Sequence, residues 1–439
     1  MMSESGFDSL PYLMRVEGCL SERLGAGGLA RSDLVRYEAR LSARLARLQD
    51  EHDRNRLPML RLPTRSDDLA ALRSLANRFR RDMADVVVLG TGGSSLGART
   101  LCALPGAGGP RLHFLDNIDP DGIETVLARI DPARTGYLVV SKSGSTAETL
   151  CQFAIVFDHW RQAATGREAA DHFVAITVPD ASPLRRAAAR LGFPVLDHDP
   201  AVGGRFSILS LVGLLPAFIH GVDGRALREG AALVLDETLS AASALDAPPA
   251  AGAALLVGLA EGRGRSQSVL MPYIDVLFPF ALWFRQLWAE SLGKNGKGLT
   301  PIAARGAVDQ HSQLQLYLDG PADKVVTMIQ AAMGGTGRRI GPDWAEADSD
   351  LAYLGGRTMG DLMAAEQRAT AETLIKRGHP VRVFEIDALS ARTLGGLLMH
   401  FMLETVFAAE LLGVDPFDQP AVEEGKVLAR EYLREQARR

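Results

Sequence analysis

Short apolar runs alternate with stretches of helical periodicity through the first half of this chain. Four runs, at 85–89, 112–115, 137–140 and 173–178, are each followed by polar or glycine-rich residues and then by a helix-like segment. Strands that alternate with helices in this way predict βαβ units and a parallel sheet.

The residues before the first apolar run follow a different pattern. Leu34, Tyr37, Leu41 and Leu45 recur at helical spacing among many arginines and glutamates. This period is typical of an amphipathic helix. We therefore predict that residues 1–80 form an N-terminal helical segment.

A second α/β unit is predicted after the turn-type dipeptide at 223–224. We therefore expect two α/β domains, at 81–224 and 225–412, and a charged C-terminal helix within 413–439 that spans about 420 to 437. The alanine-rich stretch 241–254 fits either a helix or a surface connection. In the second domain, strands are predicted at 268–273, 325–329 and 381–386, and helices at 278–292 and 391–412.

Composition narrows the class of protein. Hydrophobic residues make up 47% and charged residues 23% of the 439 residues, as in globular proteins. The formal net charge of −5 gives no overall basic field for nucleic acid or a membrane surface. Cys19, Cys102 and Cys151 fit neither a disulfide framework nor a zinc site, which favours a reducing cytoplasm. The polar residues 1–10 do not resemble a secretory signal, and the apolar stretch 209–219 is too short to span a bilayer.

The first chemical signal is a glycine-rich loop directly after the first strand. Its sequence is Gly90-Thr91-Gly92-Gly93-Ser94-Ser95-Leu96-Gly97. Glycines let a backbone approach an anion, and the N–H groups of a helix N-terminus point at it. Ser94 can add a hydroxyl donor. The loop lacks the Gly-Lys-Ser/Thr of a nucleotide P-loop, and a tight strand–helix turn without a ligand explains it equally well.

A second loop, after the strand at 137–140, strengthens the case for an anion site. The run Ser141-Lys142-Ser143-Gly144-Ser145-Thr146 places four hydroxyls and one lysine in six residues. A phosphate monoester is bound by several short donors near a helix N-terminus. A helix cap made by Ser145 or Thr146 is the alternative, and it is compatible with a phosphate site. Both loops follow parallel strands, so we expect them to meet at one edge of the sheet.

Three further residues are candidates for chemistry. Two glycines, the second of them Gly204, precede Arg205 and free the backbone for a guanidinium to reach into a cleft; a surface turn is the alternative. Gln286 and Glu290 lie four apart on a mostly apolar helix and so share one face. A carboxylate beside aromatic bulk suits a general base, whereas an ion pair between Glu290 and Lys294 is the alternative.

A histidine and a lysine lie in polar runs further along the chain. His311 belongs to Asp309-Gln310-His311-Ser312-Gln313, and Lys426 lies two turns into the last helix, near whose start Gln419 precedes Pro420. A lone histidine is more often structural, and a lysine on a charged helix is more often solvated. The histidines show no spacing typical of metal ligands, so we expect no metal.

Together these segments resemble the phosphoglucose isomerase family, whose domains have the sugar-isomerase (SIS) fold. The likeness extends from about residue 85 to residue 426. The resemblance implies two SIS-type αβα sandwich domains with parallel sheets, plus N-terminal and C-terminal helices. It also implies a cytoplasmic homodimer that interconverts glucose 6-phosphate and fructose 6-phosphate in glycolysis and gluconeogenesis, without a cofactor. The most specific pieces are Val202-Gly203-Gly204-Arg205-Phe206-Ser207, Glu290-Ser291-Leu292-Gly293-Lys294, Asp309-Gln310-His311-Ser312-Gln313-Leu314-Gln315 and the run 417–426.

The resemblance also implies roles for individual residues. Glu290 matches the base that moves a proton between C2 and C1, and Arg205 matches the arginine that stabilises the enediolate. His311 and Lys426 match residues assigned to ring opening, in an active site between subunits where the histidine comes from the partner chain. The phosphate-binding and substrate-binding positions match Ser94, Ser141, Lys142, Ser143, Thr146, Gly204, Gln286 and Gln419.

Some positions depart from the family pattern, notably Gly144, Pro420 and the run Gly296-Lys297-Gly298-Leu299. They resemble a compact bacterial branch and leave sugar specificity open, so a dual phosphoglucose/phosphomannose isomerase is the first alternative. A non-catalytic SIS module that senses a phosphosugar would not require the catalytic set. A nicotinamide dehydrogenase would use the first loop and leave the second unexplained.

Overall fold

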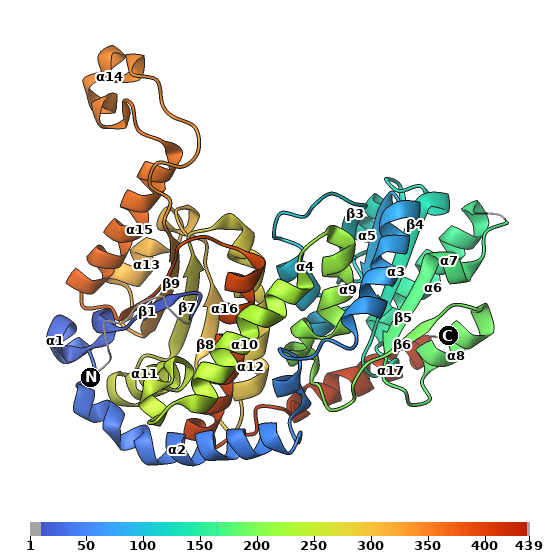
Figure 1. The fold of residues 1–439 in the computed structure, drawn as a ribbon, viewed down its shortest axis with the longest axis horizontal. Helices are drawn as coiled ribbons and strands as arrows, with labels where there is room; N and C mark the ends of the chain where they lie inside the picture. Colours follow the sequence, from blue (N-terminus) through green and yellow to red (C-terminus); the bar gives the residue numbers. More distant parts are fainter. Residues whose placement is uncertain (1–9, 165, 437–439) are drawn as a thin grey trace.

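The computed structural model describes residues 10–164 and 166–436, and two five-stranded sheets organise them (Figure 1). The first sheet is parallel throughout, in the order β3-β2-β4-β5-β6. Four of its strands coincide with the predicted apolar runs. The fifth, β6, was not predicted, because a three-residue edge strand carries too short a pattern. The strands are β2 (Asp85–Leu89), β3 (Arg111–Leu115), β4 (Thr135–Val140), β5 (Phe173–Thr177) and β6 (Val195–Asp197).

The second sheet has the order β1-β10-β9-β7-β8 and is parallel except for β1. Strand β1 pairs antiparallel with β10, with Leu13 opposite Glu385. The prediction of a helical segment up to residue 80 was therefore wrong at β1, whose partner is distant in sequence. Strand β8 was also missed. The strands are β1 (Leu13–Arg15), β7 (Gln267–Pro272), β8 (Thr300–Ala303), β9 (Lys324–Ala331) and β10 (Val381–Ile386).

Helices cover both faces of the two sheets (Figure 1). Those of the first half are α3 (Leu69–Asp82), α4 (Leu96–Leu101), α5 (Pro120–Leu127), α6 (Ala147–Ala163), α7 (Ala169–His172), α8 (Pro183–Leu191) and α9 (Leu211–His220). Those around the second sheet are α1 (Ser21–Leu24), α2 (Arg31–Asp53), α10 (Gly224–Ser240), α11 (Pro248–Arg263), α12 (Phe278–Leu292), α13 (Leu314–Asp319), α14 (Asp343–Ala347), α15 (Met359–Lys376) and α16 (Ala391–Leu412). The chain closes with α17 (Glu423–Gln436).

The N-terminal segment is shared between the two halves. Helix α2 packs on α11 and α16, whereas α3 packs on α9 of the first half. The predicted domain boundaries stay predictions. The polar start of the chain and the predicted helix end at residue 437 lie outside the described residues.

The core of the second half is built on α16. This helix is long and apolar enough to cross a membrane, but 94% of its apolar window is buried inside the protein, against α10, α11 and α12. The alanine-rich stretch resolves into a short turn and then α11, whose Ala250, Ala253 and Ala254 are fully buried. It is therefore a packed helix and not a surface connection.

The strand order of the first sheet defines where a ligand can bind. The chain leaves β2 toward β3 on one side and leaves β4 toward β5 on the other. In open α/β sheets, ligands bind outside the carboxyl ends of the strands at such a switch point. The loops at 90–97 and 141–146 follow β2 and β4 and therefore flank it.

Candidate active site

The loop after β2 needs its glycines because other backbone packs directly against it. Gly92 has a φ of +57°, in the left-handed region. A Cβ on Gly93 would lie 2.4 Å from the carbonyl carbon of Gly204, so the two glycine turns are in contact. A Cβ on Gly92 would lie 2.9 Å from Gln286 Nε2. The half-buried Ser94 therefore stands beside two other predicted site segments.

The loop after β4 forms a cluster of hydroxyls at the start of α6. Ser141 Oγ donates to Thr146 Oγ1 at 3.1 Å, and Ser143 Oγ lies 3.4 Å from the same oxygen. Thr146 occupies the N-cap position of α6, yet no side-chain cap forms there in the described chain. The alternative of a helix cap is thus correct in placing Thr146 at the N-cap and wrong in expecting its side chain to make the capping hydrogen bond. The free N–H groups of a 17-residue helix remain available to an anion.

Gly144 allows this loop to turn. Its φ is +61°, and a Cβ there would lie 2.2 Å from Ser182 Oγ and 2.8 Å from Thr177 Oγ1. The departure from the family pattern at this position therefore has a local steric reason. Only glycine combines this backbone conformation with the close approach of Ser182.

Lys142 is half-buried, and burial lowers the pKa of its ammonium. Asp199 opposes this effect, and the charge of Arg205 adds to it. Burial also lowers the pKa of His198 to about 4, and Lys142 contributes to that lowering. Sequence reasoning missed His198 and Asp199, although they stand just before the glycine pair that precedes Arg205.

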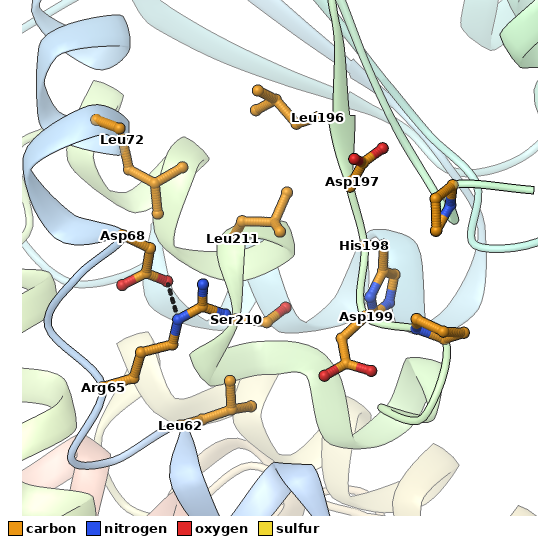
Figure 2. Close-up of a pocket in the computed structure, with 13 residues that line it drawn as sticks. Leu62, Arg65, Asp68, Leu72, Leu196, Asp197, His198, Asp199, Ser210 and Leu211 are labelled. Carbon is orange, nitrogen blue, oxygen red and sulfur yellow. Dashed lines mark ion pairs between the residues drawn. The ribbon is translucent and has the colours of Figure 1, made fainter.

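His198 and Asp199 line a cavity of about 340 Å³ between β6 and the segment that leads into α3 (Figure 2). Figure 2 shows Arg65 and Asp68 on the opposite wall, where they form an ion pair. No predicted site residue lines this cavity among the residues described. The charge of Lys142 affects the pKa of His198 in its wall, but the predicted site residues do not gather at this cavity.

Arg205 lies in the 3₁₀ turn η6 (Gly204–Leu209) and is almost fully buried. Its Nε donates to Ser291 Oγ at 2.8 Å, and its Nη2 donates to the carbonyls of Pro416 and Asp418. Its Nη1 donates to Glu290 and Gln419. The alternative of an exposed arginine on a surface turn is wrong. Burial lowers the pKa of the guanidinium, and Glu290 opposes that effect.

Glu290 is held from two sides on α12. Gln286 Nε2 donates to Glu290 Oε1 at 3.0 Å, and Arg205 Nη1 donates to Glu290 Oε2 at 3.3 Å. The shared helix face predicted for the two α12 residues is confirmed. The alternative ion pair with Lys294 does not form in the described chain, because Lys294 Nζ pairs with Asp418 Oδ1 at 2.7 Å.

Gln419 reaches this cluster from the segment between α16 and α17. Its Oε1 accepts from Arg205 Nη1 at 2.7 Å. Hydrogen bonds thus join four predicted residues into one cluster next to the glycine loop after β2: Gln286, Glu290, Arg205 and Gln419. This arrangement gathers a carboxylate, a buried cation and two amides beside that loop.

His311 and Lys426 are placed elsewhere in a single chain. His311 is exposed at the end of the 3₁₀ turn η9 (Val308–Gln310). Lys426 is 54% exposed on α17 and pairs with Glu423 at 2.6 Å. Within residues 10–164 and 166–436, no hydrogen bond or ion pair joins either residue to the cluster around Glu290. Their roles in ring opening stay predictions.

The described residues hold no group of three or more His, Cys, Asp or Glu side chains able to bind a metal ion. The cysteines Cys19, Cys102 and Cys151 are free thiols.

Comparisons with known proteins show the family of the chain. A sequence model described as phosphoglucose isomerase matches residues 74–316. The glucose-6-phosphate isomerase of Rubrobacter xylanophilus is 40% identical, over 91% of this chain and 93% of its own length. A crystal structure of a hypothetical protein from Thermus thermophilus matches with a TM-score of 0.84 and 35% identity, covering 96% of this chain and all of that one.

A crystal structure of a glucose-6-phosphate isomerase from Chlamydia trachomatis has a TM-score of 0.79 over 96% of this chain and 92% of that one. At 23% identity it supports the fold alone. The predicted α/β class, with parallel sheets of the SIS type, is confirmed. The family model spans more than half of the chain, and the relatives match nearly its full length. The chain belongs to the phosphoglucose isomerase family.

Proposed function

We propose that this protein is a glucose-6-phosphate isomerase, which interconverts glucose 6-phosphate and fructose 6-phosphate. The observation that carries the proposal is the position of Glu290. Its carboxylate lies between the Gln286 amide and the buried Arg205 guanidinium, and Gln286 in turn lies against Gly92 of the loop after β2. A base, a fixed cation and a phosphate site are the groups that an aldose–ketose isomerisation requires.

The phosphate group of the substrate is placed on the two loops of the first sheet. Ser141, Ser143 and Thr146 supply hydroxyl donors, and the N-terminus of α6 supplies backbone N–H groups. Lys142 adds a positive charge, and Ser94 contributes from the neighbouring loop. We assign the sugar carbons to the side of α12, because Gln286 on that helix lies against Gly92 of the first loop.

Proton transfer is assigned to Glu290. The carboxylate removes the proton from C2 of the open-chain aldose, and the electron pair forms the C1–C2 double bond of an enediolate. The same proton returns to C1 as the ketose forms, while the C2 hydroxyl loses its proton to become the carbonyl and the C1 oxygen gains a proton to become the hydroxyl. Negative charge develops on the oxygen at C1, and the Arg205 charge, which cannot be titrated away, stabilises it.

Within the guanidinium, Nη1 is the nitrogen suited to this task. Nε and Nη2 are bound to Ser291 and to backbone carbonyls, which fix the plane of the group. Nη1 contacts the side chains of Glu290 and Gln419 and so lies next to the proposed base.

Ring opening is assigned to His311 and Lys426, following the family resemblance. Because neither contacts the Glu290 cluster in one chain, we include a homodimer with shared active sites in the proposal, in which His311 of one subunit completes the site of the other. A cytoplasmic location and roles in glycolysis and gluconeogenesis complete it.

The deciding experiment is an assay of the purified protein with glucose 6-phosphate in the presence of a chelator. We expect fructose 6-phosphate to form, as detected by a coupled enzyme. A parallel arm with mannose 6-phosphate tests the dual-specificity alternative. Binding of glucose 6-phosphate without turnover would instead favour a non-catalytic phosphosugar-binding protein and contradict the proposal.

A further inference from the structure

Residues 413–419, here called the strap, carry the chain from the end of α16 to α17 and place Gln419 on Arg205. Three cations hold it. Lys297 Nζ donates to Leu412 O at 2.6 Å, where the strap begins. Lys294 Nζ donates to Asp415 O and pairs with Asp418 Oδ1 at 2.7 Å. Arg205 Nη2 donates to Asp418 O at 3.0 Å and to Pro416 O.

A tight turn after α12 aims the two lysines at the strap. Asn295, Gly296 and Gly298 have φ values of 54°, 70° and 113°, all in the left-handed region. A Cβ on Gly298 would lie 3.0 Å from Leu292 O, so the turn folds back on the helix end. Lys297 thereby reaches the C-terminal carbonyls of α16, where the helix dipole favours a cation.

Lys294 is the more buried partner of its ion pair. Its side chain is 12% exposed, whereas that of Asp418 is 56% exposed. It lies one helical turn beyond Glu290, a spacing that favours pairing with that carboxylate. The pair forms with Asp418 instead, immediately before Gln419. Lys294 thus forms its ion pair with the strap and not with Glu290, the proposed base.

We propose that Lys294 and Lys297 are positioning residues for the sugar end of the site. By fastening the strap, they keep Gln419 on Arg205 Nη1 beside Glu290. This inference rests on the proposed function. It assigns a purpose to the run Gly296-Lys297-Gly298-Leu299, which departs from the family pattern.

The two ends of the site then depend on different contacts. The phosphate end is built by loops of the first sheet, and none of the strap contacts lies in those loops. Loosening the strap should therefore impair recognition and turnover of the sugar while leaving the affinity for a bare phosphate unchanged. A general loss of folding would weaken both together.

The test compares Lys294→Met with Lys294→Arg, which keeps the charge, and with Lys376→Met as a control on an exposed lysine at the end of α15. Steady-state kinetics give kcat and KM for glucose 6-phosphate, and inorganic phosphate serves as a competitive inhibitor. We expect Lys294→Met to lower kcat/KM about tenfold, with the phosphate inhibition constant changed less than about twofold. Lys294→Arg should restore most of the activity, and Lys376→Met should match the wild type.

Asp418→Asn provides a second variant, at an exposed side chain whose replacement spares the core. It should lower kcat/KM in the same direction and again leave phosphate inhibition unchanged. The inference is overturned if Lys294→Met keeps wild-type kcat/KM, or if kcat/KM and phosphate affinity fall in parallel. A wild-type protein that fails to convert glucose 6-phosphate would overturn the proposed function instead, and so the two failures are distinguishable.

Discussion

Arg205 Nη1 lies 3.3 Å from Glu290 Oε2, so the proposed base and the proposed enediolate-stabilising cation are in direct contact. The side chain of Arg205 is 2% exposed and that of Glu290 is 34% exposed. Four partners besides Glu290 hold the guanidinium, whereas the carboxylate is partly exposed to solvent. We infer that substrate binding displaces the carboxylate from the guanidinium and leaves the cation in place.

Glu290→Gln should abolish isomerisation and spare substrate binding. The amide keeps the size of the side chain and can still bond to Gln286, but it cannot accept the C2 proton. General base catalysis contributes about 10²- to 10⁴-fold, and kcat should fall by that amount. Calorimetry with glucose 6-phosphate measures the binding that remains. A variant with near-normal turnover would remove Glu290 from the proposed mechanism.

Lys142→Ala should act mainly on KM. The ammonium is assigned to the phosphate, which the substrate carries unchanged from ground state to transition state. A hydrogen bond to a charged group contributes about 1.5–3 kcal/mol, so KM should rise about 10- to 100-fold. Initial rates over a range of glucose 6-phosphate concentrations measure it, with Lys376→Ala as the control. A loss confined to kcat would place Lys142 in the chemical step.

Local features of the site were predictable from the sequence, and long-range ones were not. Gln286 and Glu290 lie four apart on one helix, so their shared face follows from the helical period alone. The competing pair between Glu290 and Lys294 follows from the same rule. That predicted pair is wrong because Lys294 forms its ion pair with Asp418, on a segment remote in sequence.

The distinction between local and long-range features also explains why strand β1 and the burial of His198 were not predicted. Strands β2 and β10 carry apolar runs that predict them directly. Strand β1 depends on pairing with β10 at the far end of the chain, and no local pattern indicates it. His198 looks ordinary in the sequence, because its burial and the nearby charge of Lys142 arise from the packing of β6 beside β5.

Gly144→Ala should disrupt the phosphate loop. The residue has a φ of +61°, and the added methyl would lie 2.2 Å from Ser182 Oγ. Strain of this kind costs about 1–3 kcal/mol. We expect weaker inhibition by inorganic phosphate and a lower midpoint of urea unfolding. Gly425→Ala is the matched control, because a Cβ there has no atom within 4 Å. Equal behaviour of the two variants would show that the loop tolerates a side chain.

Three buried histidines tie the stability of the fold to pH. Burial lowers the pKa of His198 to about 4, and it also lowers the pKa of His379 and of His400. The ring of His400 bonds to Tyr12 at 2.6 Å and to Glu404 at 2.8 Å, in the core of the second half. In the unfolded chain these histidines titrate near pH 6.5.

His198→Gln should therefore make the protein less sensitive to mild acid. Between pH 6.5 and 4 the unfolded chain binds a proton at residue 198 that the folded protein does not, so stability rises with pH across this window. The contribution of His198 is fully present above pH 6.5 and is lost as the pH falls toward 4; it amounts to roughly 3 kcal/mol. The midpoint of urea unfolding, measured at pH 7 and pH 5, should fall less in His198→Gln than in the wild type. His159→Gln, at a half-buried histidine of α6, serves as the control. An equal fall in His198→Gln and the wild type would mean that residue 198 takes up its proton without unfolding, and that the cavity lined by His198 admits enough water to solvate the charged ring.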